Sequence, residues 1–100
     1  MHYNLENKKV LITGASGGIG KSLCEKFIKN NCKIICTTSS DEKINLLKKN
    51  YGSDHDYYLL NLSDINSLMT TAKKIADEHN DIDILINNAG LTSDNLFLRM

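Results

Sequence analysis

The sequence predicts an α/β fold in which helices cover a parallel sheet, and two observations support this prediction. Short apolar runs alternate with helical patterns along the whole chain, which is the order expected for parallel strands joined by crossover helices. A glycine-rich segment, residues 13–20, directly follows the first apolar run and precedes the first helical pattern. The 100 residues contain no proline and no linker-like stretch, so we expect one compact unit.

The first half of the chain predicts two strands and two helices. Residues 9–13 form a first strand, and a helix follows in which apolar residues recur at four-residue spacing. Residues 33–38 form a second strand, after which Ser39 and Glu42 make a capping-box pattern ahead of a short helix. The expected ends of the two helices are Asn30-Asn31 and Gly52. Their apolar faces carry Ile19, Leu23, Cys24, Phe27 and Ile28, and then Ile44, Leu47 and Tyr51.

The second half predicts two more strands around the most regular helix of the chain. Residues 57–62 form a third strand, Ser63 caps the helix behind it, and residues 82–86 form a fourth strand. The apolar stripe of this helix consists of Ile65, Leu68, Met69, Ala72, Ile75 and Ala76. Right-handed crossovers place the strands in the order 3-2-1-4, which is half of a Rossmann-type doubly wound parallel sheet with three α/β/α layers.

Charge and composition argue against several classes of function. Twelve basic residues balance twelve acidic ones, so the chain has no general attraction for nucleic acid or acidic membranes. The start lacks a signal peptide, and no apolar run reaches the ~20 residues that span a bilayer. We therefore expect a cytoplasmic protein with no nucleic-acid or membrane partner. Cys24, Cys32 and Cys36 lack metal-binding spacing, so we expect buried thiols and no metal site.

The glycine-rich segment lies where a fold of this kind places a phosphate-binding turn, between the first strand and the first helix. Gly14 can adopt turn geometry that a Cβ would obstruct, and Gly18 lets the backbone approach a pyrophosphate. Gly20 allows the helix to lie close on the strand. Free N–H groups at the helix start, reinforced by the helix dipole, would then face the phosphate.

Two other interpretations of this segment stay open. It can serve only as a tight connection, although the surrounding strand and helix pattern favours phosphate binding. Gly20-Lys21-Ser22 also matches the end of the NTPase phosphate loop, G-x-x-x-x-G-K-[ST], but Gly14 stands one position too early for its first glycine. The fourth strand ends in Asn87-Asn88 instead of the magnesium-binding Asp of such enzymes. We expect Lys21 and Ser22 to face solvent, and magnesium-dependent ATP binding would support the NTPase class.

The segment 13–20, together with Asn87-Asn88-Ala89-Gly90, resembles the two signatures of short-chain dehydrogenases/reductases. Residues 90–100 are further similar to the segment that follows in bacterial 3-oxoacyl-[acyl-carrier-protein] reductases of fatty acid synthesis, and the similarity runs from about Leu5 to Met100. The resemblance implies an oxidoreductase that uses NADPH to reduce 3-oxoacyl-[acyl-carrier-protein] to the 3-hydroxyacyl product, with a homotetramer as the intact enzyme. The alternatives are an acetoacetyl-CoA or other short-chain carbonyl reductase, and a non-catalytic nucleotide-binding fragment.

The resemblance also implies a cofactor site. The glycine-rich turn would line the pyrophosphate and ribose, Asn61 and Leu62 would meet the adenine, and Asn88, Ala89 and Gly90 would lie beside the nicotinamide ribose. The turn residues assigned to the site are Gly14, Ala15, Ser16, Gly17, Gly18, Ile19 and Gly20.

The end of the second strand predicts the choice of cofactor. NAD enzymes usually place an Asp or Glu there, about 20 residues after the glycines, to bind the ribose 2′-hydroxyl. This chain instead has Thr37, Thr38, Ser39 and Ser40, whose hydroxyls can donate to a 2′-phosphate. We therefore predict NADP(H), with Thr37 and Ser39 in the site and Ser39 at the phosphate-contacting position of the family. Gly17 stands where many NADP-linked members have an Arg, and helix capping by Ser39 and Ser40 is compatible with binding.

The sequence supplies no catalytic residue of this family, whose members use a Ser and a Tyr followed four positions later by a Lys. Four positions after Tyr3, Tyr51, Tyr57 and Tyr58 stand Asn7, His55, Asn61 and Leu62. The resemblance therefore implies that the Ser, Tyr and Lys lie beyond residue 100. The fourth strand lacks a neighbour, which also predicts that the fold continues there. Residues 1–100 are then the N-terminal part of a single NADP(H)-binding Rossmann domain without its catalytic and substrate-binding remainder. Such a fragment is expected to be inactive alone.

Overall fold

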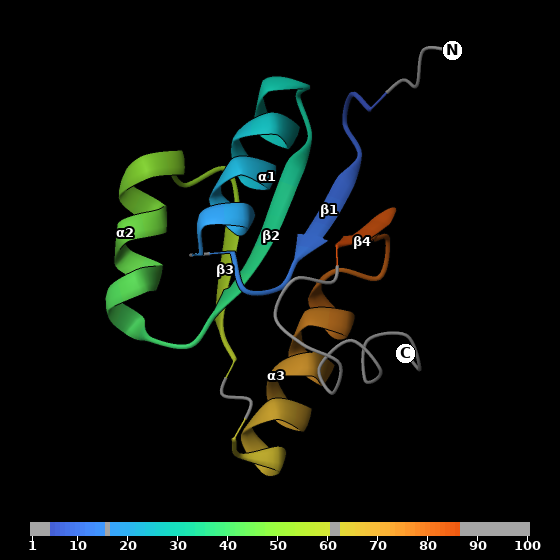
Figure 1. Ribbon diagram of the computed structural model, residues 1–100. Helices are drawn as coiled ribbons and strands as arrows, with labels where there is room; N and C mark the ends of the chain where they lie inside the picture. Colours follow the sequence, from blue (N-terminus) through green and yellow to red (C-terminus); the bar gives the residue numbers. More distant parts are fainter. Residues whose placement is uncertain (1–4, 16, 61–62, 87–100) are drawn as a thin grey trace.

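A computed structural model describes residues 5–15, 17–60 and 63–86 of the chain, in which strands and helices alternate (Figure 1). The strands are β1 (Lys9–Ile12), β2 (Lys33–Thr38), β3 (Asp56–Leu59) and β4 (Ile84–Ile86). The helices are α1 (Gly18–Lys29), α2 (Asp41–Tyr51) and α3 (Ile65–Glu78). The alternation of strands and helices that the sequence predicted is confirmed.

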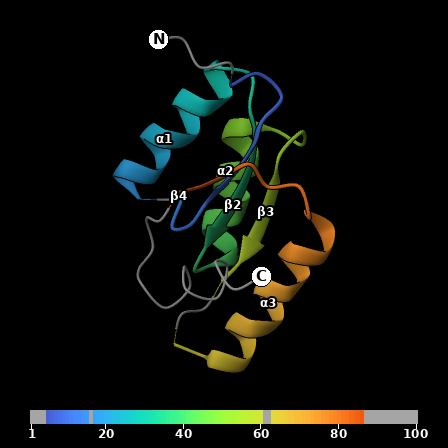
Figure 2. The same cartoon turned by 90° about the vertical axis from the view of Figure 1, so that its right-hand side faces the viewer.

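The four strands form one parallel sheet in the order β3-β2-β1-β4, which confirms the predicted order. Val10 of β1 lies opposite Ile34 of β2 on one side and Ile84 of β4 on the other. Figure 2 shows α1 and α3 on opposite sides of the sheet. The α1 and α2 layer, the sheet and the α3 layer make up the predicted three-layer arrangement.

The central strands β1 and β2 are buried on both faces, as expected for a sheet between two helical layers. Val10 and Ile34 belong to the apolar cluster that includes Cys24 of α1 and Leu47 of α2, whereas Leu11 and Ile35 lie in a cluster with Ile75 of α3. Full burial of one such side chain stabilises the fold by about 1.5–3 kcal/mol. These two clusters hold the ends of the strands in place. The structure also confirms that Cys24, Cys32 and Cys36 are buried, free thiols.

The N-caps of α2 and α3 each lie one residue later than the sequence predicted. Ser40, not Ser39, caps α2, and its Oγ accepts a hydrogen bond from the Lys43 N–H at 3.3 Å. Asp64, not Ser63, caps α3 with a carboxylate that accepts from two N–H groups of the first turn. In both cases neighbouring residues are good N-caps, so side-chain type alone could not separate them.

The apolar stripe of α3 is buried only in part. Leu68, Ala72 and Ile75 are fully buried, whereas Ile65 and Met69 of the same predicted stripe are 54% and 53% exposed. Figure 1 shows that the first turns of α3 lie beyond the end of β3. Strand ends also differ from the predicted ones by one to three residues: β4 begins at Ile84 instead of residue 82, and β3 ends at Leu59 instead of residue 62.

His55, just before β3, makes folding sensitive to pH. The Ile34 N–H donates to its Nδ1 at 3.0 Å, which requires an unprotonated Nδ1, and burial lowers the His55 pKa below the 6.5 of an exposed imidazole. Because the unfolded chain binds the proton more readily, neutral His55 stabilises the folded state above pH 6.5, and this stabilisation is lost as the pH falls below that value. The hydrogen bond itself contributes about 1 kcal/mol.

We therefore expect the free energy of unfolding to fall between about pH 7.5 and pH 5.5 more steeply in the wild type than in His55→Asn. The asparagine Oδ1 can still accept from the Ile34 N–H, but it does not titrate in this range. Urea unfolding at several pH values measures the difference. Equal pH dependence in the two proteins would contradict the role assigned to His55.

Candidate functional site

The turn between β1 and α1 lies at the carboxyl edge of the sheet, where parallel α/β sheets bind their ligands (Figure 1). Gly14 has a φ of 63°, in the left-handed region that disfavours residues with a Cβ. The structure thus bears out the reason given for a glycine at this position.

Gly20 permits a close contact between α1 and the turn. A Cβ at this position would lie 2.5 Å from the Gly14 carbonyl oxygen and 2.8 Å from Ala15 Cα. No other residue fits without moving backbone atoms. The close approach is therefore to the turn after β1, whereas the sequence predicted a close approach to the strand.

The first part of the turn is tied to the two strands beside β1. The Gly14 N–H donates to Thr37 Oγ1 at 3.3 Å, and the Ala15 N–H donates to the Thr37 carbonyl oxygen at 3.0 Å. On the other side, the Thr13 N–H and hydroxyl lie 3.2 and 3.3 Å from the Ile86 carbonyl oxygen. The amides of Gly14 and Ala15 therefore act within the fold.

The start of α1 has the free amides that the sequence predicted. Gly17 is the N-cap, has extended backbone and provides no side-chain cap, and its carbonyl accepts from the Lys21 N–H at 2.8 Å. The N–H groups of Gly18, Ile19 and Gly20 come before that bond, and a helix has no acceptor of its own for its first N–H groups. Apart from the backbone of α1 itself, a Cβ at Gly18 would meet none of the described residues within 4 Å, so the described part of the chain leaves the space in front of it open.

The electrostatics of this helix start favour an anion. The positive end of the helix dipole lies there, and no acidic residue stands in the first turn of α1. Lys21 and Ser22 are exposed on that turn, as predicted. Backbone donors, open space and positive potential together suit a phosphate group.

The four hydroxyl residues after the middle of β2 differ in their surroundings. Thr37 and Thr38 are 1% and 3% exposed, and Ser40 caps α2. Ser39 is exposed. Ser39 is thus the residue of the four that can meet a ligand at the outer side of this edge without giving up a cap. No acidic side chain lies on β2 itself.

Six predicted site residues lie outside the described residues: Ser16, Asn61, Leu62, Asn88, Ala89 and Gly90. Their contacts with a cofactor stay predictions. The described chain leads up to two of them, because the Leu60 N–H donates to the Thr38 carbonyl oxygen at 2.8 Å and so keeps the end of β3 beside the end of β2.

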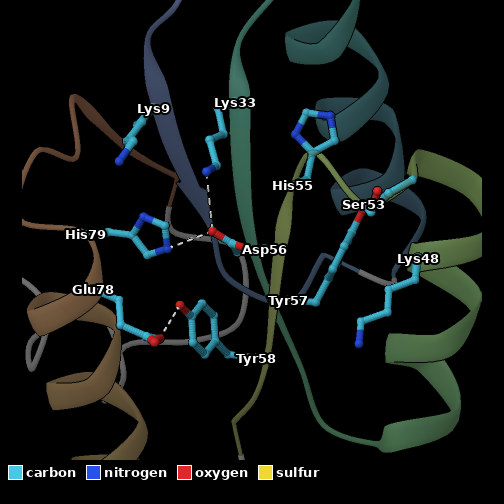
Figure 3. Close-up of a pocket in the computed structure, with 11 residues that line it drawn as sticks. Lys9, Lys33, Lys48, Ser53, His55, Asp56, Tyr57, Tyr58, Glu78 and His79 are labelled. Carbon is cyan, nitrogen blue, oxygen red and sulfur yellow. Dashed lines mark hydrogen bonds and ion pairs between the residues drawn. The ribbon is translucent and has the colours of Figure 1, made fainter.

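A pocket of about 740 Å³ lies at the opposite edge of the sheet (Figure 3). It is lined by Lys9, Lys33 and Asp56, which are the first residues of β1, β2 and β3. We do not assign the ligand site to this pocket, because parallel α/β sheets bind ligands at the carboxyl ends of their strands.

The charged groups of this pocket join α3 to the sheet. Figure 3 shows Lys33 and His79 both pointing at the Asp56 carboxylate, at 3.5 and 2.9 Å. The Tyr58 hydroxyl donates to Glu78 Oε1 at 2.7 Å. These contacts pair groups from β2, β3 and the end of α3, so they serve the fold. Sequence analysis did not find them, because their partners are distant along the chain.

Within residues 5–15, 17–60 and 63–86 no group of three or more His, Cys, Asp or Glu side chains is placed to hold a metal ion. In the same part of the chain, none of the helices has the length and apolar character required to cross a membrane.

Comparison with known proteins gives consistent matches. The family model for short chain dehydrogenases matches residues 8–100. The chain is 41% identical to the 3-oxoacyl-[acyl-carrier-protein] reductase FabG of Vibrio harveyi and 38% identical to that of Escherichia coli, in each case over 97 residues. Each match covers 97% of this chain and 40% of the relative, so the chain spans two fifths of the length of these proteins.

A solved structure agrees with this result. A short-chain dehydrogenase from Streptomyces avermitilis superposes with a TM-score of 0.71 at 27% identity, covering 84% of this chain and 31% of that one. The chain is therefore similar to short-chain dehydrogenases in the path of its backbone as well as in its sequence.

Proposed function

Because the chain belongs to the short-chain dehydrogenase family, we propose that it is the cofactor-binding part of an NADPH-dependent 3-oxoacyl-[acyl-carrier-protein] reductase. Membership makes the protein an oxidoreductase with a nicotinamide cofactor. The finer assignment is supported by the relatives named FabG in Vibrio harveyi and Escherichia coli. The proposed reaction is the reduction of the 3-oxo group to a 3-hydroxyl group. The proposed location of the intact enzyme is the cytoplasm, and its proposed assembly is a homotetramer.

The observation that carries the proposal is the helix start at the carboxyl edge. The amides of Gly18, Ile19 and Gly20 would bind the pyrophosphate, and the open space at Gly18 admits it closely. Bound NADPH would supply the hydride. Among the residues outside the description, Ser16 would line the ribose, Asn61 and Leu62 the adenine, and Asn88, Ala89 and Gly90 the nicotinamide ribose.

The proposed preference for NADP(H) rests on the end of β2. No carboxylate lies on β2 itself to bind a ribose 2′-hydroxyl, and Ser39 is exposed just after its end. The acidic residues Asp41 and Glu42 stand in the first turn of α2, beyond the Ser40 cap. Two unit charges about 4 Å apart near a protein surface interact with about 4 kcal/mol. A carboxylate at this position would therefore reverse the preference.

We expect Ser39→Asp to weaken NADPH binding at least ~10-fold relative to NADH, because a carboxylate repels the 2′-phosphate and accepts from a 2′-hydroxyl. The matched control is Ser39→Asn, which has nearly the same shape without the charge and should change the ratio little. Dissociation constants of both dinucleotides for the intact protein measure the ratio. Tighter binding of NADH than of NADPH by the wild type would contradict the proposed cofactor.

The substrate is tested separately from the cofactor. No tyrosine among these 100 residues is followed four positions later by a lysine, so we assign no catalytic residue and propose that these residues alone are inactive. The experiment measures the rate at which the intact protein consumes NADPH, followed by its absorbance, with acetoacetyl-[acyl-carrier-protein] and with acetoacetyl-CoA. The two rates compare the proposed substrate with its alternative. Faster turnover of the CoA ester would contradict the carrier-protein assignment.

A further inference from the structure

Thr37 occupies an unusual place at the end of β2. Pairing between β1 and β2 ends at Ile12 and Cys36, while β2 continues to Thr38. The backbone of Thr37 therefore faces the turn after β1 instead of a neighbouring strand on that side. Its carbonyl oxygen and its Oγ1 accept from two successive amides of the turn, those of Ala15 at 3.0 Å and Gly14 at 3.3 Å.

The turn held in this way is in contact with the start of α1. Gly14 has a φ of 63°. A Cβ on Gly20 would lie only 2.5 Å from the Gly14 carbonyl oxygen. Ala15 is completely buried. Since interiors of this density do not deform freely, a displacement of Gly14 or Ala15 would also displace the first turn of α1.

We propose that Thr37 is a positioning residue of the cofactor site, which holds the turn so that the amides at the start of α1 stay directed at the pyrophosphate. This inference rests on the proposed function. The Thr37 side chain is 1% exposed and its Oγ1 accepts from Gly14, so it acts through the backbone of the turn. The position of Thr37 at the end of the second strand had predicted a different task, a contact with the cofactor itself.

The two roles differ in which dinucleotide they affect. A residue that holds the pyrophosphate-binding backbone affects NADPH and NADH equally, because both carry the same pyrophosphate. A residue that contacts the 2′-phosphate affects NADPH alone. The ratio of the two dissociation constants therefore separates these two roles. A general loss of stability would also leave the ratio unchanged, so it requires a separate control.

The test compares Thr37→Val, which keeps the shape but loses the acceptor, with Thr37→Ser, which keeps the acceptor, in the intact protein. We expect Thr37→Val to weaken both dinucleotides about tenfold with an unchanged ratio, and Thr37→Ser to remain within about twofold of the wild type. Thr37→Ala is a second variant without the hydroxyl. Ile35→Val removes a buried methylene two residues earlier on β2, in the cluster with Ile75 of α3, and controls for lower stability.

Three results would overturn the inference. Weakening of NADPH alone would assign Thr37 to the 2′-phosphate, and unchanged binding in both Thr37→Val and Thr37→Ala would remove any role in the site. Equal weakening in Ile35→Val at the same loss of thermal stability would reduce Thr37 to a residue of the fold. If the wild type binds neither dinucleotide, the proposed function itself fails, and that result is distinct from the other three.

Discussion

Gly20→Ala is expected to abolish measurable dinucleotide binding and to destabilise the protein by about 3 kcal/mol, the upper end of the usual cost of overpacking. The added methyl group would lie 2.5 Å from the Gly14 carbonyl oxygen and 2.8 and 2.9 Å from two backbone atoms of Ala15. Both residues are bonded to Thr37, so neither can yield without breaking hydrogen bonds. Relief of the overlap must therefore shift the turn or the start of α1.

Chemical unfolding and dinucleotide titration of the intact variant measure the two effects. Gly18→Ala adds the same methyl group two residues earlier, where no described residue outside the backbone of α1 lies within 4 Å, and is the matched control for stability. If Gly20→Ala unfolds at the wild-type denaturant concentration, the close contact between helix and turn is not a constraint on this fold.

Gly18→Ala is expected to weaken dinucleotide binding by about 10- to 100-fold while leaving stability close to that of the wild type. The protein has room for the methyl group, but a pyrophosphate held by the amides at the helix start would meet it, at an overlap cost of about 1–3 kcal/mol. Loss of binding with intact folding is the signature of a glycine that serves a ligand.

Calorimetric titration with NADPH measures this effect, and Ser22→Ala is the control within the first turn of α1. Ser22 is exposed, and an NTPase loop would use its hydroxyl, whereas the dinucleotide site proposed here does not. Wild-type affinity in Gly18→Ala would mean that the ligand does not approach the backbone here. Loss of affinity in Ser22→Ala would favour the NTPase interpretation.

Much of the fold follows from patterns within the sequence. The order of strands and helices follows from hydrophobic periodicity, and the order 3-2-1-4 then follows from the handedness of crossovers. The role of Gly14 was predicted because it follows a local rule of backbone geometry. At Gly20 the need for a close contact was predicted, but the contact is with the turn after β1 and not with the strand.

Other features depend on tertiary contacts, which the sequence pattern does not contain. Ile65 and Met69 continue the apolar stripe of α3 but are exposed, unlike Leu68, Ala72 and Ile75. The pairing of His79 with Asp56 joins residues that are far apart in sequence. Thr37 was predicted as a cofactor contact from its position alone, and only the structure shows that its hydroxyl oxygen accepts from the Gly14 N–H.

The central claim is that the first amides of α1 bind the pyrophosphate of a dinucleotide, and amide NMR of the isotope-labelled intact protein during titration with NADPH tests it directly. We predict saturable shifts of the Gly18, Ile19 and Gly20 amide signals, with those of Asp56 and His79 at the opposite edge unchanged. Saturable shifts at Asp56 and His79 with an unmoved helix start would contradict the claim and place the ligand in the other pocket.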